Sequence, residues 1–275
     1  MYPPLPQKQK WLSIQVSRGI AAILIICFHT WEMLITYTGD GGCCRLLDGV
    51  WRAGASGVDI FFIISGFIIV HSTKGKLQGV KSCRLFLQKR AVRIVPLYWI
   101  YSCFFLLLVL CPYTLKNTEF SLQHTVLSFL FIPTVNPVTG LVLPLLPQAW
   151  TLSYEVYFYI FFATLLLQKK KFILPGLALF FISSVCAGLF IETENALIKV
   201  VLNPLLLEFV LGGYLAHQIC SISIRNRLCY FMILAGLVTL LLAGVYQIPI
   251  DYRVISYGGP CFGIVTGLVC LEKVE

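Results

Sequence analysis

The sequence has few charged residues, since only 12% of its 275 residues are Asp, Glu, Lys or Arg. Soluble globular domains carry roughly 25%, so this chain cannot cover a water-facing surface. Hydrophobic residues make up 58% of the chain and give it a mean hydropathy of +0.85. A membrane-spanning helix needs about 20 mostly apolar residues, which leaves room for about eight. The sequence therefore predicts an all-α, polytopic membrane bundle.

Three further features are lacking, and each absence disfavours another class of protein. The 11 cysteines show no metal-ligand spacing, so no metal site is predicted. Most of them fall in apolar segments, where a cysteine behaves as a small apolar residue. The first apolar segment has no A-x-A-like cleavage site and contains Arg18, so it is expected to be an uncleaved span. No internal repeat is evident, which disfavours a transporter built from inverted repeats.

The basic residues between the apolar segments predict the topology. With a cytoplasmic N-terminus, the inside segments hold 15 Lys and Arg and the outside segments five, as the positive-inside rule requires. The net charge of +9 then mostly reflects the basic residues that set the membrane topology, and no nucleic-acid partner is expected. Residues 1–11 are expected to form a cytoplasmic tail and residues 12–272 one membrane domain. The predicted spans lie near residues 12–31, 53–73, 95–111, 150–167, 172–191, 197–217, 228–247 and 254–271.

Two connecting segments stand out. The stretch from Lys74 to Arg93 is the most basic and is predicted to be a cytoplasmic loop, followed by Pro96 in the first turn of the next helix. Between Pro112 and Ala149, the run SLQHTVLSFLFIP is apolar but too short to span. We expect it to lie at the membrane interface or to pack on the bundle.

Ionisable residues within the predicted spans are the strongest functional signal, because a charge at the bilayer centre costs about 2.5–3.5 kcal/mol. Arg18 and His29 stand 11 residues apart in SRGIAAILIICFHT. On a helix they would share one side and lie about 16 Å apart along the axis. Asp59 in GVDIFFIISGF and Glu155 in WTLSYEVYFY come early in spans that enter from outside, near the predicted depth of His29.

These residues predict two clusters with different chemistry. Arg18, Arg90 and Arg93 would gather near the inner boundary, where guanidinium groups can bind phosphates through paired hydrogen bonds. A histidine beside a carboxylate, as is expected for His29, can take a proton from a hydroxyl near neutral pH. Each residue also has a plainer interpretation, as a topology signal or a structural ion pair. Because several of these residues gather at each of two depths, the pattern favours a group-transfer reaction. A phosphate-bearing donor would enter from inside, and a hydroxyl acceptor would bind outside.

The motifs together resemble a known family. RGIAAILIICFH, GVDIFFIISGFII, FLQKRAVRIVPLYW, PQAWTLSYEVYFYIFF and NPLLLEFVLGG follow the order and spacing of the acyltransferase-3 family of integral membrane acyltransferases, over about residues 11 to 272. The chain most resembles the branch that acylates bacterial exopolysaccharides. This resemblance implies a multi-pass protein of the bacterial inner (plasma) membrane. It would transfer an acyl group, usually acetyl, from acyl-CoA to a hydroxyl of a surface polysaccharide or its lipid-linked precursor.

The resemblance also implies roles for individual residues. The family's Arg-x10-His motif falls on Arg18 and His29, and this histidine is expected to be the catalytic base. Its Arg-x-x-Arg motif falls on Arg90 and Arg93, which are expected to bind the donor together with Arg18. The expected partners are acyl-CoA, a carbohydrate acceptor and membrane lipids. No cofactor is expected beyond the acyl-CoA donor substrate.

Two carboxylates complete the expected catalytic set: Asp59 matches the family's GVD motif, and Glu155 matches W-S/T-L-S-x-E. Family members typically continue into a further loop and two helices with a motif like LGDASYSLYLxH, which this sequence lacks. We therefore expect it to be C-terminally incomplete relative to them. Two alternatives stay open: a transporter with an intramembrane His/carboxylate relay, and an inactive, truncated acyltransferase remnant.

Overall fold

The computed structural model consists of helices and their connections in the part of the chain that it describes. Within that part, the β pairing is confined to one isolated bridge between Val135 and Val142. The helices form two compact units. Unit 1 contains the described residues up to Ser72 and from Leu211 onwards, and unit 2 extends from Thr73 to Val210. The described residues are 11–38, 45–74, 78–111, 120–222, 224–249 and 252–274.

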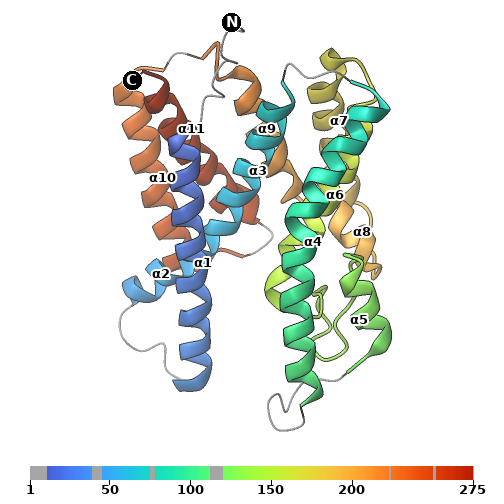
Figure 1. The fold of residues 1–275 in the computed structure, drawn as a ribbon. Helices are drawn as coiled ribbons and strands as arrows, with labels where there is room; N and C mark the ends of the chain where they lie inside the picture. Colours follow the sequence, from blue (N-terminus) through green and yellow to red (C-terminus); the bar gives the residue numbers. More distant parts are fainter. Residues whose placement is uncertain are drawn as a thin grey trace, which may run out of the picture. The chain divides into compact units, whose positions relative to one another are not determined.

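Unit 1 combines segments from both ends of the chain. Its elements are α1 (Leu12–Thr38), α2 (Arg45–Ala53), η1 (Gly54–Ser56), α3 (Gly57–Thr73), α9 (Leu206–Gln218), α10 (Asn226–Tyr246), the π-helical η5 (Val254–Gly258) and α11 (Gly259–Val274). The last residue of α3 and the first residues of α9 belong to unit 2. Figure 1 shows α1, α10 and α11 side by side, with α2 against α1 and α10. One apolar cluster, which includes Ile14 of α1, Ile63 of α3 and Val265 of α11, joins helices of this unit.

Glycines allow the helices of unit 1 to approach closely. A Cβ atom built on Gly212 of α9 would lie 1.8 Å from the carbonyl oxygen of Ile63 on α3. A Cβ on Gly57 would lie 2.5 Å from the carbonyl oxygen of Ala21 on α1. Small residues at such contacts are typical of membrane bundles, because association there depends on close packing rather than on the hydrophobic effect.

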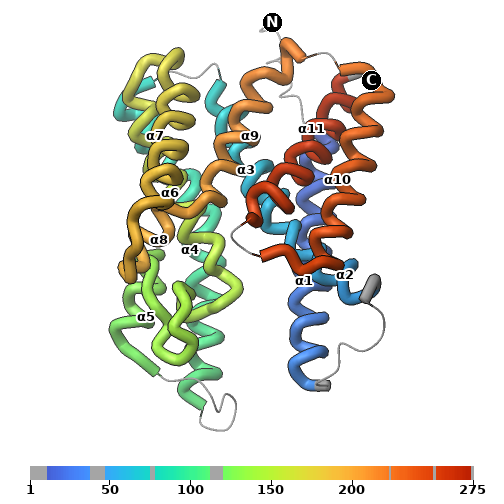
Figure 2. The backbone as a smooth tube through the Cα atoms, turned by 180° about the vertical axis from the view of Figure 1, so that it is seen from behind, coloured from blue at the N-terminus to red at the C-terminus, as the bar shows by residue number. Residues whose placement is uncertain are grey.

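Unit 2 is held together by aromatic side chains. Its elements are α4 (Val80–Leu110), α5 (Leu122–Phe129), η2 (Pro147–Ala149), α6 (Trp150–Leu165), η3 (Lys170–Phe172), α7 (Ile173–Gly188) and α8 (Ala196–Val201). Helix α6 contacts both α4 and α7, as Figure 2 shows from behind. The Phe158 ring stacks on those of Phe162, Phe181 and Phe209, at centroid distances of 6.0, 5.8 and 4.5 Å.

The predicted membrane spans agree with the helices. Among the described residues, seven helices are long and apolar enough to cross a membrane by length and composition. They correspond to every predicted span except the fourth, for which α6 has 16 residues. The short apolar run between Pro112 and Ala149 forms α5, which packs on α4 through a 2.9 Å hydrogen bond from the Tyr98 hydroxyl to the Ser128 carbonyl oxygen. The predicted tail lies outside the described residues, except for Trp11.

The start of α4 differs from the prediction. The sequence predicts a loop from Lys74 to Arg93, whereas α4 begins at Val80 and continues through the basic residues. Lysine and arginine lower the hydropathy but are good helix formers, so hydropathy misplaces this boundary. Pro96, predicted in the first turn, lies inside the helix. Membrane helices tolerate an internal proline because neighbouring groups satisfy the freed backbone atoms.

Candidate active site

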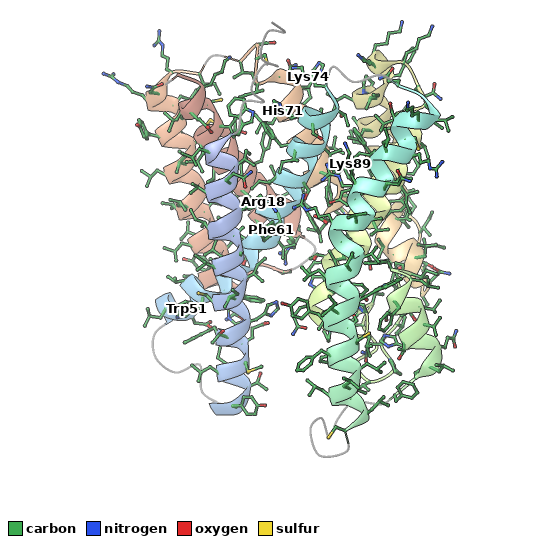
Figure 3. The ribbon with its side chains drawn as sticks, viewed as in Figure 1. Arg18, Trp51, Phe61, His71, Lys74 and Lys89 are labelled. Carbon is green, nitrogen blue, oxygen red and sulfur yellow. The ribbon has the colours of Figure 1, made fainter. Side chains whose placement is uncertain are left out.

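Arg18 and His29 lie on one unbroken helix, α1, as the sequence predicts. Arg18 is half-buried and His29 is exposed. Figure 3 shows Arg18 at about the same level along unit 1 as Phe61 of α3. Because His29 is 11 positions after Arg18, the two side chains leave the same side of α1 about 16 Å apart along its axis. The helix therefore carries a permanent cation and a titratable base on one side.

The carboxylate beside His29 belongs to its own helix. The Nδ1 atom of His29 lies 3.7 Å from Oε2 of Glu32, and both side chains are nearly half exposed, at 43% and 48%. The sequence instead predicts Asp59 or Glu155 as the orienting carboxylate. In the described part of unit 1, Glu32 is the acidic residue in contact with the imidazole. Its negative charge attracts the imidazolium that forms when His29 takes up a proton.

Asp59 is paired with Arg253, a residue that belongs to none of the sequence motifs. Asp59 lies fully buried in the first turn of α3. The Nη2 and Nε atoms of Arg253 donate to its two carboxylate oxygens at 2.8 and 3.3 Å, and Nη2 also donates to the carbonyl oxygen of Ala55 at 2.9 Å. This two-point geometry is the strong form of an arginine–carboxylate contact.

Arg253 directly precedes the π-helical η5, and its guanidinium carbon lies 5.6 Å from the centre of the Tyr257 ring in that segment. Short π-helical segments occur frequently at functional sites. From the sequence, Arg253 is simply one of the outside basic residues. No local pattern identifies its partner, because Asp59 is 194 residues away.

In unit 2, Glu155 and Arg90 meet at one tyrosine. The hydroxyl of Tyr159 donates to Oε2 of Glu155 at 3.0 Å. The guanidinium carbon of Arg90 lies 5.4 Å from the centre of the Tyr159 ring and 5.3 Å from that of Phe86. The sequence predicts Arg90 near the inner boundary and Glu155 near the outer one. Both contact Tyr159, and because α4 starts at Val80, Arg90 lies about 15 Å along the helix rather than in a loop before it.

The remaining charged residues differ in burial. Arg93 follows Arg90 by one turn of α4, so both leave the same side of the helix, yet Arg93 is exposed and Arg90 is half-buried. Glu208, in the first turn of α9, is fully buried. Unit 1 thus holds Arg18, His29 and Asp59, and unit 2 holds Arg90, Arg93 and Glu155.

Unit 2 also has an open groove of about 330 Å³ beside α5 and α8. Hydroxyl, amide and imidazole side chains contribute to its lining, together with prolines and small apolar residues, and none of the lining residues is a lysine, arginine, aspartate or glutamate. The polar members are Ser121, Gln123, His124, Thr134 and Asn195.

The N-terminus of α1 is held by the last helix of the chain. The Glu272 carboxylate, on α11, accepts hydrogen bonds from the backbone N–H groups of Leu12 and Ser13 and from the Ser13 hydroxyl. The first N–H groups of a helix have no partner within it, and the N-terminal dipole attracts a negative charge. Glu272 therefore fixes the start of the helix that carries Arg18 and His29.

We expect Glu272→Ala to lower the free energy of unfolding by about 1–2 kcal/mol, the usual cost of losing a helix cap. Thermal unfolding in detergent, followed by circular dichroism, measures this loss. Glu194→Ala is the matched control, because Glu194 pairs with Lys199 at the surface and is 98% exposed, so its loss leaves the unfolding transition unchanged. Equal effects of the two substitutions would show that the Glu272 cap contributes nothing specific.

A helical membrane bundle that carries a histidine, an arginine pair and buried carboxylates has groups suited to acyl transfer to a hydroxyl. The comparisons with known proteins identify this class. A family model described as "Acyltransferase domain" matches residues 11–273, and the chain belongs to this family, the acyltransferase-3 family of the sequence analysis. It is therefore a multi-pass membrane acyltransferase, and the transporter alternative is not supported.

A relative supports the assignment. The "Exopolysaccharide production protein ExoZ" of Rhizobium meliloti (strain 1021) is 32% identical to this chain over 225 residues, which cover 80% of the chain and 68% of the relative. No solved structure matches the chain.

Proposed function

We propose that the protein transfers an acetyl group from acetyl-CoA to a hydroxyl of an exopolysaccharide or its lipid-linked precursor, in the inner membrane of a bacterium. The observation that carries this proposal is the placement of Arg18 and His29 on one side of a single continuous helix. An arginine suits the phosphates of the donor, and a histidine suits the hydroxyl of the acceptor. The helix separates the two groups by about 16 Å, in keeping with a long donor bound at its phosphates and reactive at its far end.

The reaction follows from these groups. A ring nitrogen of His29 takes the proton of the acceptor hydroxyl as its oxygen attacks the carbonyl carbon of the thioester. The new C–O bond gives the ester, and the C–S bond breaks. The proton on the imidazole then passes to the leaving thiolate, which departs as free CoA. Glu32 lies 3.7 Å from Nδ1 of His29 and stabilises the imidazolium between these two steps.

The donor's phosphates would be bound by Arg18, Arg90 and Arg93. Of these three arginines, Arg93 is exposed, whereas Arg90 and Arg18 are half-buried. Arginine suits this role because its planar guanidinium group can form two parallel hydrogen bonds with one phosphate. Asp59 and Glu155 stay proposed members of the catalytic set, Asp59 through its partner Arg253 and Glu155 through its partner Tyr159.

A carbohydrate acceptor is supported by two observations. The relative ExoZ is described as an exopolysaccharide production protein. In addition, the groove beside α5 and α8 offers hydroxyl and amide groups without formal charge, which suits the hydroxyls of a neutral sugar. The positive-inside rule, applied to the basic segments of the sequence, predicts that this part of unit 2 faces the outer side of the membrane.

His29→Ala is the substitution that tests the proposal. Membranes that contain the protein are given radiolabelled acetyl-CoA and exopolysaccharide, and the label that appears in the polysaccharide is measured. We expect the substitution to lower the rate by about 10²–10⁴, the usual contribution of a general base. Parallel reactions with propionyl-CoA and succinyl-CoA identify the preferred acyl group.

His217→Ala is the matched control, because His217 is an exposed histidine in the last turn of α9 and should leave the rate unchanged. Retained transfer in His29→Ala would contradict the proposed role of His29. A wild-type protein that transfers no acyl group from any of the three donors would support the inactive remnant.

A further inference from the structure

Tyr159 occupies a central place in unit 2, and the proposed function names it only as the partner of Glu155. It lies on α6, one helical turn after Glu155, and is 6% exposed. Its hydroxyl donates to Oε2 of Glu155 at 3.0 Å. Its ring lies 5.4 Å from the guanidinium carbon of Arg90 on α4. One side chain thus contacts a carboxylate through its oxygen and a cation through its ring.

The ring contact is reinforced by a second aromatic residue. Phe86 lies one turn before Arg90 on α4, and its ring centre is 5.3 Å from the same guanidinium carbon. The Phe86 and Tyr159 rings meet edge to face, with centroids 6.1 Å apart and an interplanar angle of 88°. Because the faces of aromatic rings attract cations, the two rings together hold the Arg90 guanidinium at a defined position between α4 and α6.

The hydroxyl is not explained by packing. The neighbouring positions of α6 that build the aromatic core, Phe158 and Phe162, are phenylalanines and stack on each other. A phenylalanine at position 159 would fill the same space without placing a polar atom in the interior, which costs free energy unless that atom is hydrogen-bonded. The partner of the buried hydroxyl is Glu155, so the hydrogen bond to this carboxylate explains why the position holds a tyrosine.

We propose that Tyr159 is a positioning residue of the acyl-transfer site: its hydroxyl fixes the Glu155 carboxylate, and its ring fixes the Arg90 guanidinium. A single rigid side chain then sets the geometry between the acidic group and a cation that binds the donor. This inference rests on the proposed function, which assigns Arg90 to the phosphates of acyl-CoA. It also predicts that the two contacts can be removed separately, because one depends on the oxygen and the other on the ring.

Two substitutions separate these contacts. Tyr159→Phe keeps the ring and removes the hydrogen bond, so we expect kcat to fall about tenfold, as for the loss of a hydrogen bond to a charged group. KM for acetyl-CoA should stay within about twofold of the wild-type value. Tyr159→Leu also removes the ring, so KM should rise in addition to the fall in kcat. Both constants are measured with the whole 275-residue chain in detergent or membranes.

Tyr157→Phe is the matched control. Tyr157 lies on the same helix and its ring packs edge to face on Phe181, with centroids 6.0 Å apart, but its hydroxyl has no hydrogen bond to a described residue. We expect this variant to have wild-type kcat and KM. Thermal stabilisation by added CoA gives a readout other than turnover: Tyr159→Phe should keep the wild-type shift, and Tyr159→Leu should lose most of it.

The outcomes distinguish this inference from the proposed function. If the wild-type protein is active and Tyr159→Phe has the same kcat, Tyr159 has no positioning role. If the kcat of Tyr159→Phe falls only in proportion to a loss of folded protein, its role is structural and the inference is overturned. A wild-type protein without transfer or CoA stabilisation would overturn the proposed function, and the inference with it.

Discussion

Replacing Arg253 by methionine is expected to lower the free energy of unfolding by about 3–5 kcal/mol, because it leaves the Asp59 carboxylate buried without its counter-ion. Asp59 is fully buried, and Arg253 donates to both of its oxygens and to the carbonyl oxygen of Ala55. Methionine keeps an unbranched apolar stem but is shorter than arginine and lacks the guanidinium group, so the substitution removes the counter-ion together with its hydrogen bonds. Thermal or denaturant unfolding of the purified protein in detergent measures the effect.

A second ion pair of unit 1 provides the matched control. Arg52 pairs with Asp48 at 2.8 Å on α2, but the two side chains are 32% and 13% exposed. Because water screens such a pair, Arg52→Met should cost less than about 1 kcal/mol. If Arg253→Met is no more destabilising than Arg52→Met, the Asp59–Arg253 pair does not stabilise the bundle.

The double variant Asp59→Leu with Arg253→Met separates stability from catalysis. Replacing both members of a buried ion pair by apolar residues of similar size is often close to neutral, so we expect most of the lost stability to return. Acyl transfer is then measured in the same preparation. We expect transfer to stay low, since Asp59 belongs to the proposed catalytic set. Full recovery of transfer would show that the pair acts on stability alone.

Gly212→Ala is expected to destabilise the protein by about 1–3 kcal/mol or more, the range for overpacking a tight contact. The added Cβ would lie 1.8 Å from the Ile63 carbonyl oxygen and 2.9 Å from the backbone nitrogen of Phe67. Both atoms belong to the backbone of α3, so no side-chain rotation can relieve the clash and the two helices must separate. The midpoint of thermal unfolding in detergent reports this loss.

Gly263→Ala controls for the helix propensity of the new residue. Gly263 lies inside α11, and the nearest atom to an added Cβ there is the Met232 carbonyl oxygen at 3.7 Å, an ordinary contact. Alanine is favoured over glycine within helices by about 0.5–1 kcal/mol, so this variant should be as stable as the wild-type protein or slightly more so. Stabilisation by both substitutions would contradict the close approach of α9 and α3.

Much of the fold could be predicted because the bilayer fixes the length of an apolar helix. The helices begin or end within a few residues of most predicted span boundaries. The prediction fails at α4, where basic residues between Val80 and Arg93 continue the helix. Hydropathy distinguishes apolar from polar residues, whereas helix formation depends on helix propensity. Lysine and arginine are polar but have high helix propensity.

The candidate site could also be predicted only in part, because contacts between distant segments leave no local pattern in the sequence. The relation between Arg18 and His29 could be predicted because both lie on one helix, where spacing alone fixes their direction. Tyr159 carries a readable signal as well: it is a tyrosine one turn after a carboxylate, in a segment rich in aromatic residues. Arg253 carries none, since its pairing with Asp59 depends on how segments 194 residues apart pack together.

That separation has a consequence for biosynthesis. Ribosomes add about 5–20 residues per second, so Asp59 is synthesised about 10–40 s before Arg253, 194 residues later. Glu272, which caps α1, follows Leu12 by 260 residues. While unit 2 is synthesised, the Asp59 carboxylate therefore lacks its partner Arg253, and the N-terminus of α1 lacks its cap Glu272. A nascent chain halted before Arg253 would therefore lack both the partner of Asp59 and the cap of α1.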